Sequence, residues 1–294
     1  MNEDLFRPPR TFAGLEQKHT SFTDSRVVII PAPYDSTSEY KCGSREGPQA
    51  IIDASQYLEL YDYELGTEIS RVGIYTLPEV QPLTSSPESM LERISAITSD
   101  LLKQNKLPVL LGGEHSLTIG AVKAFKNRYP DLSVLQLDAH ADLRNEYMGT
   151  PYSHACVMRR VWETCPIVQA GIRSLSTDEY EFIKEHRLNV FFIETTMKGS
   201  SLDRIIAALT QHVYITIDLD VLDPSVMSAV GTPEPGGLTW EDILELLRTI
   251  AAKKHIVGFD IVELCPNQGP TACSFLAAKL AYKLIGLSTQ AKDK

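Results

Sequence analysis

The stretch Asp138-Ala139-His140-Ala141-Asp142 directly follows the apolar run Val134-Leu135-Gln136-Leu137. The apolar run is typical of a buried strand, and in an extended continuation residues 138, 140 and 142 project from the same side. Two neighbouring carboxylates repel each other unless a cation lies between them, and carboxylate with imidazole suits a divalent transition metal. Taken alone, the stretch leaves a metal site and an ordinary polar loop equally open.

Two further apolar runs end in side chains of the same kind. Tyr214-Ile215-Thr216-Ile217 leads into Asp218-Leu219-Asp220, whose two carboxylates again point the same way. Residues 107–111 lead into the glycine turn Gly112-Gly113-Glu114-His115. One metal ion would not use every candidate ligand, whereas two ions that share bridging carboxylates would. The six candidates are His115, Asp138, His140, Asp142, Asp218 and Asp220.

The alternation of short apolar runs with helical patterns predicts the fold. Strands are expected at residues 27–30, 72–75, 107–111, 134–137, 167–170, 190–193, 213–217 and 256–261. Helices are expected at residues 48–57, 89–103, 117–128, 177–186, 202–209 and 240–252, the last behind the capping-box pair Thr239 and Asp242. We therefore predict a single-domain, three-layer αβα fold whose mostly parallel sheet has about eight strands. Because such sheets bind ligands at the carboxyl ends of their strands, the six candidates are expected to meet there.

Composition narrows the classes of partner. The chain has 294 residues, 43% of them hydrophobic and 22% charged, which is ordinary for a soluble globular protein with a large core. A net charge of −10 argues against a nucleic acid or an anionic membrane as partner and is compatible with a cationic substrate. No apolar run approaches the roughly 20 residues of a membrane helix, and the first ten residues lack the apolar centre of a signal peptide. Five cysteines without a CxxC pair favour a reducing cytoplasm.

Three blocks resemble the signature motifs of the ureohydrolase family, the arginase and agmatinase enzymes. They are Gly112-Gly113-Glu114-His115-Ser116, Asp138-Ala139-His140-Ala141-Asp142 and Asp218-Leu219-Asp220-Val221-Leu222-Asp223-Pro224. Further matches are Ser153-His154, Gly231-Thr232-Pro233-Glu234-Pro235-Gly236-Gly237 and Gly258-Phe259-Asp260-Ile261-Val262-Glu263. The resemblance runs from about residue 31 to residue 286 and implies an arginase-like catalytic domain over residues 26–294. Residues 1–25, which are polar and mixed, are expected to form an arm that packs on the body or on a neighbouring subunit.

The resemblance implies a site for two manganese ions per subunit. Asp138 and Asp218 would bridge both ions. His115 and Asp142 would complete the coordination of one ion, and His140 and Asp220 that of the other. Such a pair lowers the pKa of a shared water and so provides a nucleophile at neutral pH. The resemblance also implies a homo-oligomer, because the family forms trimers and hexamers.

Three residues are assigned to the reaction itself. Glu263 would hold a guanidinium through paired, charge-assisted hydrogen bonds, as a glutamate does in the family. His154 would deliver a proton to the departing amine, because imidazole titrates near neutral pH and the family uses a histidine here as a proton shuttle. Asp142 would in addition accept a hydrogen bond from the attacking nucleophile and orient it.

The loop after the third block is expected to have a supporting role. Asp223-Pro224 most simply turns the chain after the strand, and Asp223 is a candidate for orienting a metal ligand. Gly231, Gly236 and Gly237 are expected to supply unusual backbone angles in the following segment.

The residues around the blocks favour agmatinase over arginase. Ser174 stands where arginases typically carry an aspartate that helps to recognise the α-amino group, and residues 143–153 lack the arginase pattern of Asn and Ser. Ala155 follows His154 where many agmatinases have Gly, and Cys265 occupies a place often taken by Asn. These departures leave the metal chemistry untouched but leave the substrate open.

We predict hydrolysis of agmatine to putrescine and urea, a reaction of polyamine biosynthesis. The same chemistry on another guanidino compound, such as guanidinobutyrate or arginine, is the nearest alternative. Glu146 or the loop 34–41 is expected to receive the distal ammonium of the substrate, on grounds of charge alone.

Three other hypotheses fit less well. A metallophosphoesterase also begins with Asp-x-His, but it requires a Gly-Asn-His-Asp/Glu block that this sequence lacks. A metal-dependent deacetylase resembles this fold, but it uses one zinc and does not need His115 and Asp142 as ligands. A non-catalytic homologue that acts as a binding or regulatory subunit usually has lost ligands, and all six are present here.

Overall fold

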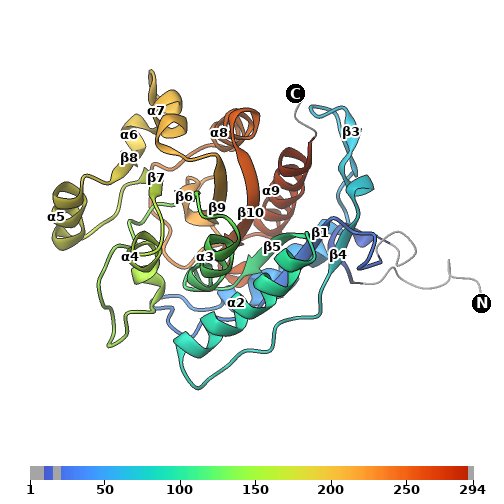
Figure 1. Ribbon diagram of the computed structural model, residues 1–294, viewed down its shortest axis with the longest axis horizontal. Coiled ribbons are helices and arrows are strands. Elements are labelled where there is room, and N and C mark those ends of the chain that lie inside the picture. The colour runs from blue at the N-terminus through green and yellow to red at the C-terminus, as the bar shows by residue number, and fades with distance from the viewer. Residues whose placement is uncertain (1–9, 16–20, 291–294) are drawn as a thin grey trace, which may run out of the picture.

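A sheet of eight strands forms the centre of the computed structural model, which describes residues 10–15 and 21–290 (Figure 1). The strand order is β4-β1-β5-β10-β9-β6-β7-β8, and every neighbouring pair is parallel. The strands are β1 (Val27–Ala32), β4 (Ile74–Thr76), β5 (Leu107–Gly112), β6 (Leu132–Leu137), β7 (Ile167–Ile172), β8 (Asn189–Phe192), β9 (His212–Asp218) and β10 (His255–Val262). The prediction of a mostly parallel sheet of about eight strands is confirmed.

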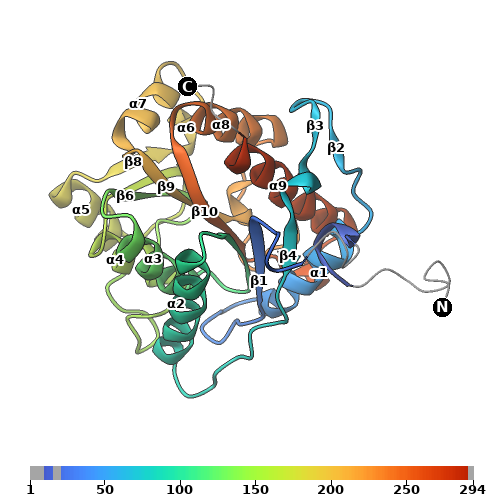
Figure 2. The same cartoon turned by 45° about the vertical axis from the view of Figure 1, so that its right-hand side comes forward.

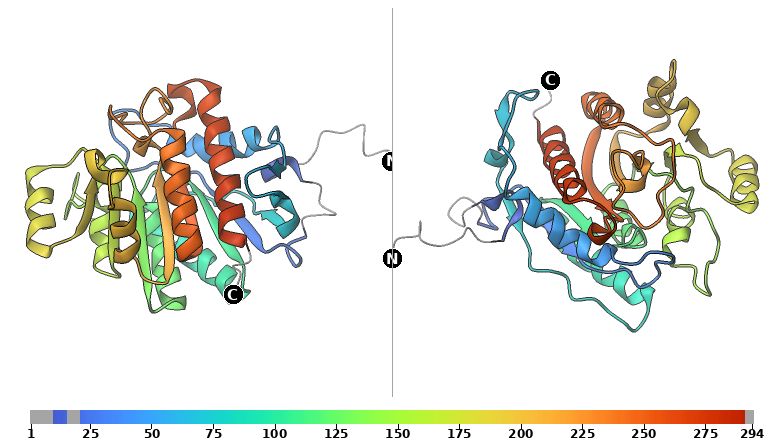
Figure 3. Two further views of the ribbon diagram at one scale, coloured as in Figure 1. Left: turned by 90° about the horizontal axis from the view of Figure 1, so that it is seen from above. Right: turned by 180° about the vertical axis from the view of Figure 1, so that it is seen from behind.

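Helices cover both faces of this sheet, as Figures 2 and 3 show. The helices α1 (Gly47–Ser55), α7 (Ser201–Ala208), α8 (Trp240–Lys253) and α9 (Thr271–Thr289) contribute to one hydrophobic core. The helices α2 (Pro87–Lys103), α3 (Leu117–Arg128), α4 (Val157–Trp162) and α5 (Thr177–His186) contribute to the core on the opposite face. Strand β1 shows why both faces are apolar, because Val27 and Ile29 belong to the first core and Val28 and Ile30 to the second. The three-layer αβα architecture is therefore confirmed.

Local capping explains where several helices begin. The Ser176 hydroxyl accepts a hydrogen bond from the Glu179 amide at the start of α5, and the Glu179 carboxylate accepts one from the Ser176 amide. Thr239 and Asp242 form the same reciprocal pair at the start of α8, as the sequence predicted. None of the described helices is both long enough and apolar enough to cross a bilayer.

Some elements differ from the expectations. Helices α4, α9 and the short α6 (Ile193–Thr196) were not predicted, and α9 is so widely buried that it has no polar stripe to reveal a helical period. The strand expected at residues 72–75 begins later, because Ile69–Val72 form a 3₁₀ turn before β4. The strands β2 (Tyr61–Asp62) and β3 (Thr67–Glu68) form a small antiparallel hairpin beside α9 (Figure 2).

Part of the predicted N-terminal arm packs on the body. Phe12 is fully buried, and its amide donates to the Thr76 hydroxyl over 2.9 Å. The Ala13 amide donates to the Ser55 hydroxyl at the end of α1 over 2.8 Å. Residues 1–9 and 16–20 of the arm lie outside the described part of the chain.

The sheet order brings the signature blocks together. Strands β5, β10, β9 and β6 are consecutive neighbours in the middle of the sheet. Because all of them are parallel, their carboxyl ends lie at one edge, where His115 follows β5, Asp138 follows β6 and Asp218 ends β9. Glu263 directly follows β10 at the same edge. Four segments far apart in the sequence therefore deliver polar side chains to one place.

Candidate functional site

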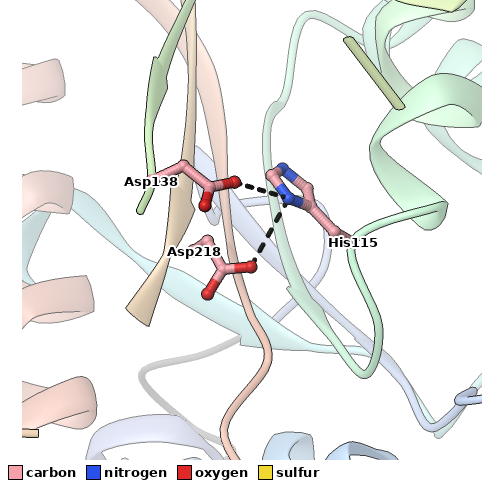
Figure 4. A group of neighbouring side chains, drawn as sticks. All are labelled: His115, Asp138 and Asp218. Atoms are coloured by element: carbon pink, nitrogen blue, oxygen red, sulfur yellow. Dashed lines mark ion pairs between the residues drawn. The ribbon is translucent and has the colours of Figure 1, made fainter. Parts of the chain in front are cut away.

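One group of candidate ligands surrounds the Nδ1 atom of His115 (Figure 4). Nδ1 lies 3.1 Å from Asp138 Oδ2, 3.0 Å from Asp142 Oδ2 and 3.5 Å from Asp218 Oδ2. The imidazole is 1% exposed, and Nδ1 makes no hydrogen bond within the described part of the chain. A buried nitrogen that faces three carboxylate oxygens without a hydrogen bond is arranged as a metal ligand is.

A second group shares Asp138 with the first. His140 Nδ1 lies 2.9 Å from Asp220 Oδ2 and 3.6 Å from Asp138 Oδ1. The ligand atoms of Asp138, His140 and Asp220 all lie within 4.8 Å of one another, as do those of His115, Asp138 and Asp218. The structure thus brings all six sequence-predicted ligands together, in two groups joined through the carboxylate of Asp138.

The electrostatics of this cluster favour a cation. Burial works against a charged His115, but the carboxylates of Asp138, Asp142 and Asp218 outweigh it and raise the pKa of His115 well above its ordinary value. Burial likewise opposes a charged His140, yet Asp220 and Asp138 raise the pKa of His140 to about 12. The protein therefore draws positive charge into the cluster, and a divalent cation would supply it in place of those protons. The donor set of imidazole nitrogens and carboxylate oxygens fits a first-row divalent metal.

Buried hydrogen bonds orient the His115 ring through Nε2, the nitrogen that does not face the carboxylates. Its Nε2 lies 2.9 Å from Thr216 Oγ1, and Thr216 Oγ1 donates to Asp260 Oδ1 over 2.6 Å. Asp260 Oδ2 also accepts from the hydroxyls of Thr118, over 2.8 Å, and Tyr214, over 2.7 Å. Since the Thr216 proton is donated to Asp260, the Thr216 oxygen accepts from His115 Nε2–H, which leaves the Nδ1 lone pair facing the carboxylates.

Two glutamines support Asp138, and sequence reasoning did not find them. Gln136 Nε2 donates to Asp138 Oδ2 over 2.6 Å and to the His140 carbonyl over 3.3 Å. Gln169 on β7 donates to Gln136 Oε1 and, over 2.7 Å, to the Ala141 carbonyl. A signal was present in the sequence, because Gln136 is a polar residue in a buried strand, two positions before Asp138 and therefore on the same face.

All of the candidate ligands except Asp138 line a cavity of about 250 Å³ that also presents Glu263 and His154. Glu263 Oε1 accepts a hydrogen bond from the His115 amide over 2.7 Å, and Oε2 has no hydrogen-bond partner among the described residues. Burial, together with the negative charge of Glu114, raises the pKa of Glu263 to about 8. A guanidinium at Oε2 would offset that cost, because it supplies the missing positive charge.

His154 begins a short 3₁₀ turn, His154–Cys156, at the wall of the cavity. Its amide donates to Thr37 Oγ1 over 3.0 Å, and its Nδ1 lies 3.3 Å from Ser153 Oγ. Nε2 has no hydrogen-bond partner in the described part of the chain, so it is the nitrogen available to a substrate. Burial lowers the pKa of His154, which favours the neutral imidazole, so the ring must take up a proton before it can donate one.

Two of these residues have unusual backbone angles. Asp142 has φ 51° and Glu263 has φ 65°, in the left-handed region that favours glycine. Such conformations are costly in non-glycine residues and persist where the surroundings demand them, often at functional sites. Here they occur at a candidate ligand and at the candidate guanidinium-binding residue.

The loop after β9 is held by two residues. Arg173 donates to the carbonyls of Asp220, over 2.7 Å, and Glu234, over 2.8 Å, and so connects the loop to the segment that carries the candidate ligand Asp220. The Asp223 carboxylate accepts from the amides of Gly236 and Gly237, so Asp223 orients this loop rather than a metal ligand. Gly236 has the unusual angle that was expected, at φ 80°, whereas a Cβ on Gly237 would collide with the backbone of residues 221–223.

The mouth of the cavity carries charges of both signs. Tyr147 donates a hydrogen bond to Glu39 over 2.5 Å, and the Arg144 guanidinium lies 4.9 Å from the centre of the Tyr147 ring. Glu39 and Lys41 of the loop 34–41 line the cavity, so this loop stays a candidate for receiving the distal ammonium of the substrate. Glu146, the other candidate, is exposed and is not part of the cavity lining.

Comparisons with known proteins show the family to which the chain belongs. The model of the arginase family matches residues 25–286. An N(1)-aminopropylagmatine ureohydrolase of Synechocystis sp. is 38% identical over 94% of this chain and 93% of that protein. An agmatinase of Bacillus cereus is 35% identical over 88% of this chain and 91% of that protein. The crystal structure of the agmatine ureohydrolase of Thermoplasma volcanium superimposes with a TM-score of 0.84 at 34% identity, over 92% of each chain.

The fold and the clustered His and Asp side chains define a metal-binding hydrolase of the αβα class. Within that class, the chain belongs to the arginase family, the ureohydrolases. The expectation drawn from the three signature blocks is thus confirmed, and the protein is an enzyme of the agmatinase-type branch of that family.

Proposed function

We propose that this enzyme hydrolyses the guanidino group of agmatine, giving putrescine and urea, with two manganese ions bound per subunit. The observation that carries the proposal is the pair of ligand groups that share Asp138, at the floor of a cavity that also presents Glu263 and His154. His115, Asp142 and Asp218 would hold one ion together with Asp138, and His140 and Asp220 would hold the other, with Asp218 as the second bridge. When bound, the metal pair supplies the Lewis acidity that ionises water at neutral pH.

Glu263 binds and orients the substrate in this proposal. A guanidinium carbon is a poor electrophile because its positive charge is spread over three nitrogens, so the group must be fixed for attack. Glu263 Oε1 is held by the His115 amide, which fixes the carboxylate and directs Oε2 to a guanidinium N–H. A charge-assisted bond of this kind is worth about 1.5–3 kcal/mol.

His154 transfers a proton in this proposal, and Asp142 orients the attacking water. Water adds to the guanidinium carbon and gives up its two protons as the carbonyl of urea forms. The bond from that carbon to the substituted nitrogen breaks, and the two protons convert the departing nitrogen into an ammonium. His154 Nε2 gives the departing nitrogen its proton, and Asp142 accepts a hydrogen bond from the attacking water and orients it. Both residues line the same cavity, so neither needs a large movement to reach the substrate.

N1-aminopropylagmatine is a second candidate substrate, and one observation favours it. It carries an additional aminopropyl arm, and hence one more positive charge, beyond the tail of agmatine. Glu39 stands at the cavity mouth, where its carboxylate is fixed by Tyr147 and would face such an arm. The Synechocystis relative, whose name specifies this substrate, is 38% identical to the chain.

Urea release from a panel of substrates tests the proposal. The purified protein, loaded with manganese, is assayed with agmatine, N1-aminopropylagmatine, guanidinobutyrate and arginine. We expect the highest kcat/KM for one of the two agmatine compounds, and a clear preference for arginine would overturn the assignment. Glu39→Gln separates the two candidates, because it should raise KM for N1-aminopropylagmatine more than for agmatine. Glu146→Gln, a neighbouring carboxylate outside the cavity lining, is the matched control.

Two further features belong to the proposal. A homo-oligomer, a trimer or a hexamer, is proposed from the family resemblance. A cytoplasmic location is proposed from the cysteine pattern, and all five cysteines are free thiols in the structure.

A further inference from the structure

Glu114 is a buried carboxylate that the proposed reaction does not use. Its side chain is 0% exposed, and it lies in the turn between β5 and α3, directly before His115. Glu114 Oε2 accepts from the Thr37 amide over 2.6 Å, and Oε1 accepts from Thr37 Oγ1 over 2.6 Å and from Ser116 Oγ. A carboxylate buried at this depth needs such partners, and two of the three come from a loop that is distant in the sequence.

Thr37 connects Glu114 to His154. A hydroxyl has one proton to donate, and the Thr37 proton is donated to Glu114. The Thr37 oxygen is therefore left as an acceptor, and the His154 amide donates to it over 3.0 Å. The His154 ring lies close to the same oxygen, with Nδ1 at 3.5 Å.

The connection joins three loops at the edge of the cavity. Thr37 follows β1, Glu114 follows β5, and His154 precedes α4. The first two loops are pressed together, because the Glu114 amide donates to the Tyr34 carbonyl over 2.7 Å and a Cβ on Gly113 would collide with that carbonyl. Hydrogen bonds through Thr37 and Glu114 thus connect His154 to the same turn that carries the candidate ligand His115.

We propose that Glu114 and Thr37 are positioning residues that hold His154 where it can protonate the departing amine. The inference rests on the proposed function for the role of His154. It adds two residues, Glu114 and Thr37, to which the proposed function assigns no role. Misplacement of a reacting group by about 1 Å can lower a rate about 100-fold. Loss of the hydrogen bonds that hold His154 is therefore expected to lower turnover.

Thr37→Val tests the link because it removes only the side-chain connection. The Thr37 amide still donates to Glu114 in this variant, so the loop keeps its anchor and KM should change little. Thr37→Ser restores the hydroxyl and should restore turnover. Thr98→Val is the matched control, because Thr98 is a buried threonine of α2 whose hydroxyl has no hydrogen-bond partner in the described chain.

Two measurements on the full-length protein are made for each variant. Steady-state urea release from agmatine should show kcat lowered by about 10- to 100-fold in Thr37→Val, with metal content unchanged and with Thr37→Ser and Thr98→Val close to wild type. Hydrogen–deuterium exchange over residues 150–158 should be faster in Thr37→Val alone, because the His154 amide loses its acceptor. The exchange measurement does not depend on turnover, so an inactive wild-type enzyme would refute the proposed function without deciding this inference.

The inference is overturned if Thr37→Val exchanges at residues 150–158 as wild type does, or if it keeps the wild-type kcat. It is also overturned if Thr37→Ser is as impaired as Thr37→Val, because a role in packing alone would then explain both. Should Thr37→Val fail to fold, Glu114→Gln serves instead, since it keeps the size of the side chain but turns an acceptor oxygen into a donor. We expect the same fall in kcat and the same faster exchange from that variant, and wild-type behaviour would again refute the link.

Discussion

Thr216→Val should weaken metal binding without touching any candidate ligand. The variant removes the acceptor of His115 Nε2–H, 2.9 Å away, and one donor to Asp260 Oδ1, 2.6 Å away. All three side chains are at most 1% exposed, so water cannot replace the lost partners. An unsatisfied buried polar group costs about 1–3 kcal/mol, and a tenfold change in affinity corresponds to about 1.4 kcal/mol. We therefore expect manganese affinity to fall about 10- to 100-fold, the range found when partners behind metal ligands are removed.

Isothermal titration of the metal-free protein with manganese measures this effect directly. Thr216→Ser keeps the hydroxyl and should bind manganese with nearly wild-type affinity, which separates the hydrogen bond from the packing of the threonine methyl. A Thr216→Val variant that binds manganese as tightly as wild type would refute the conclusion that Thr216 and Asp260 orient His115.

Three further predictions concern the reaction and the stability of the fold. His154→Asn should leave metal content unchanged by elemental analysis while kcat for agmatine falls about 10²- to 10⁴-fold, and loss of metal would show a different role. Glu263→Gln should lower kcat/KM by about 10- to 100-fold, because an amide cannot pair with the guanidinium charge, and an unchanged value would remove Glu263 from substrate binding. Lys283→Met should lower the free energy of unfolding by about 3–5 kcal/mol, because the buried Asp62 carboxylate, 3.0 Å from Lys283 Nζ, loses its cation. Burial opposes the charge of Asp62, but Lys283 outweighs it and holds the pKa of Asp62 below 3.8, so this stabilisation is present above pH 3.8 and disappears on further acidification. Denaturant unfolding at about pH 7 and below pH 3.8 checks both points, and a pH-independent difference would contradict the second.

The candidate ligands could be predicted from the sequence because each lies beside an apolar run with strand-like composition. Parallel strands placed the three blocks at one edge of the sheet, as expected. The expected period of two over Asp138, His140 and Asp142 does not hold, because β6 ends at Leu137 and Asp142 has φ 51°, so the path of the loop brings Asp142 to the site. The alternation of short apolar runs with helical patterns was also sufficient to predict a three-layer fold.

The residues that support the candidate ligands through hydrogen bonds could not be predicted in the same way. Thr216 lies two residues before Asp218 and so on the same face of β9, but its contact with Asp260 depends on β10 being the neighbouring strand. Gln136 and Gln169 meet because β6 and β7 pair in register. A linear pattern carries no information on which strands are neighbours, and these contacts became visible only with the strand order.

The contacts of residues in loops were even harder to predict from the sequence. Glu114 was part of a recognised block, but its contacts with Thr37 depend on the path of the loop after β1, which has no periodic pattern. Helix α9 was missed for a different reason, because apolar side chains surround most of its circumference and leave no contrast between faces.

The two-metal site is tested most directly by counting the manganese ions that the protein binds while urea production from agmatine is followed. Metal-free protein is titrated with manganese, and bound metal is measured by elemental analysis at each point. The two ligand groups joined by Asp138 predict two ions per chain in the wild type and fewer in Asp138→Asn, with turnover that requires the second ion. Binding of one ion at most, or full metal content in Asp138→Asn, would contradict a site in which Asp138 joins two metal ions.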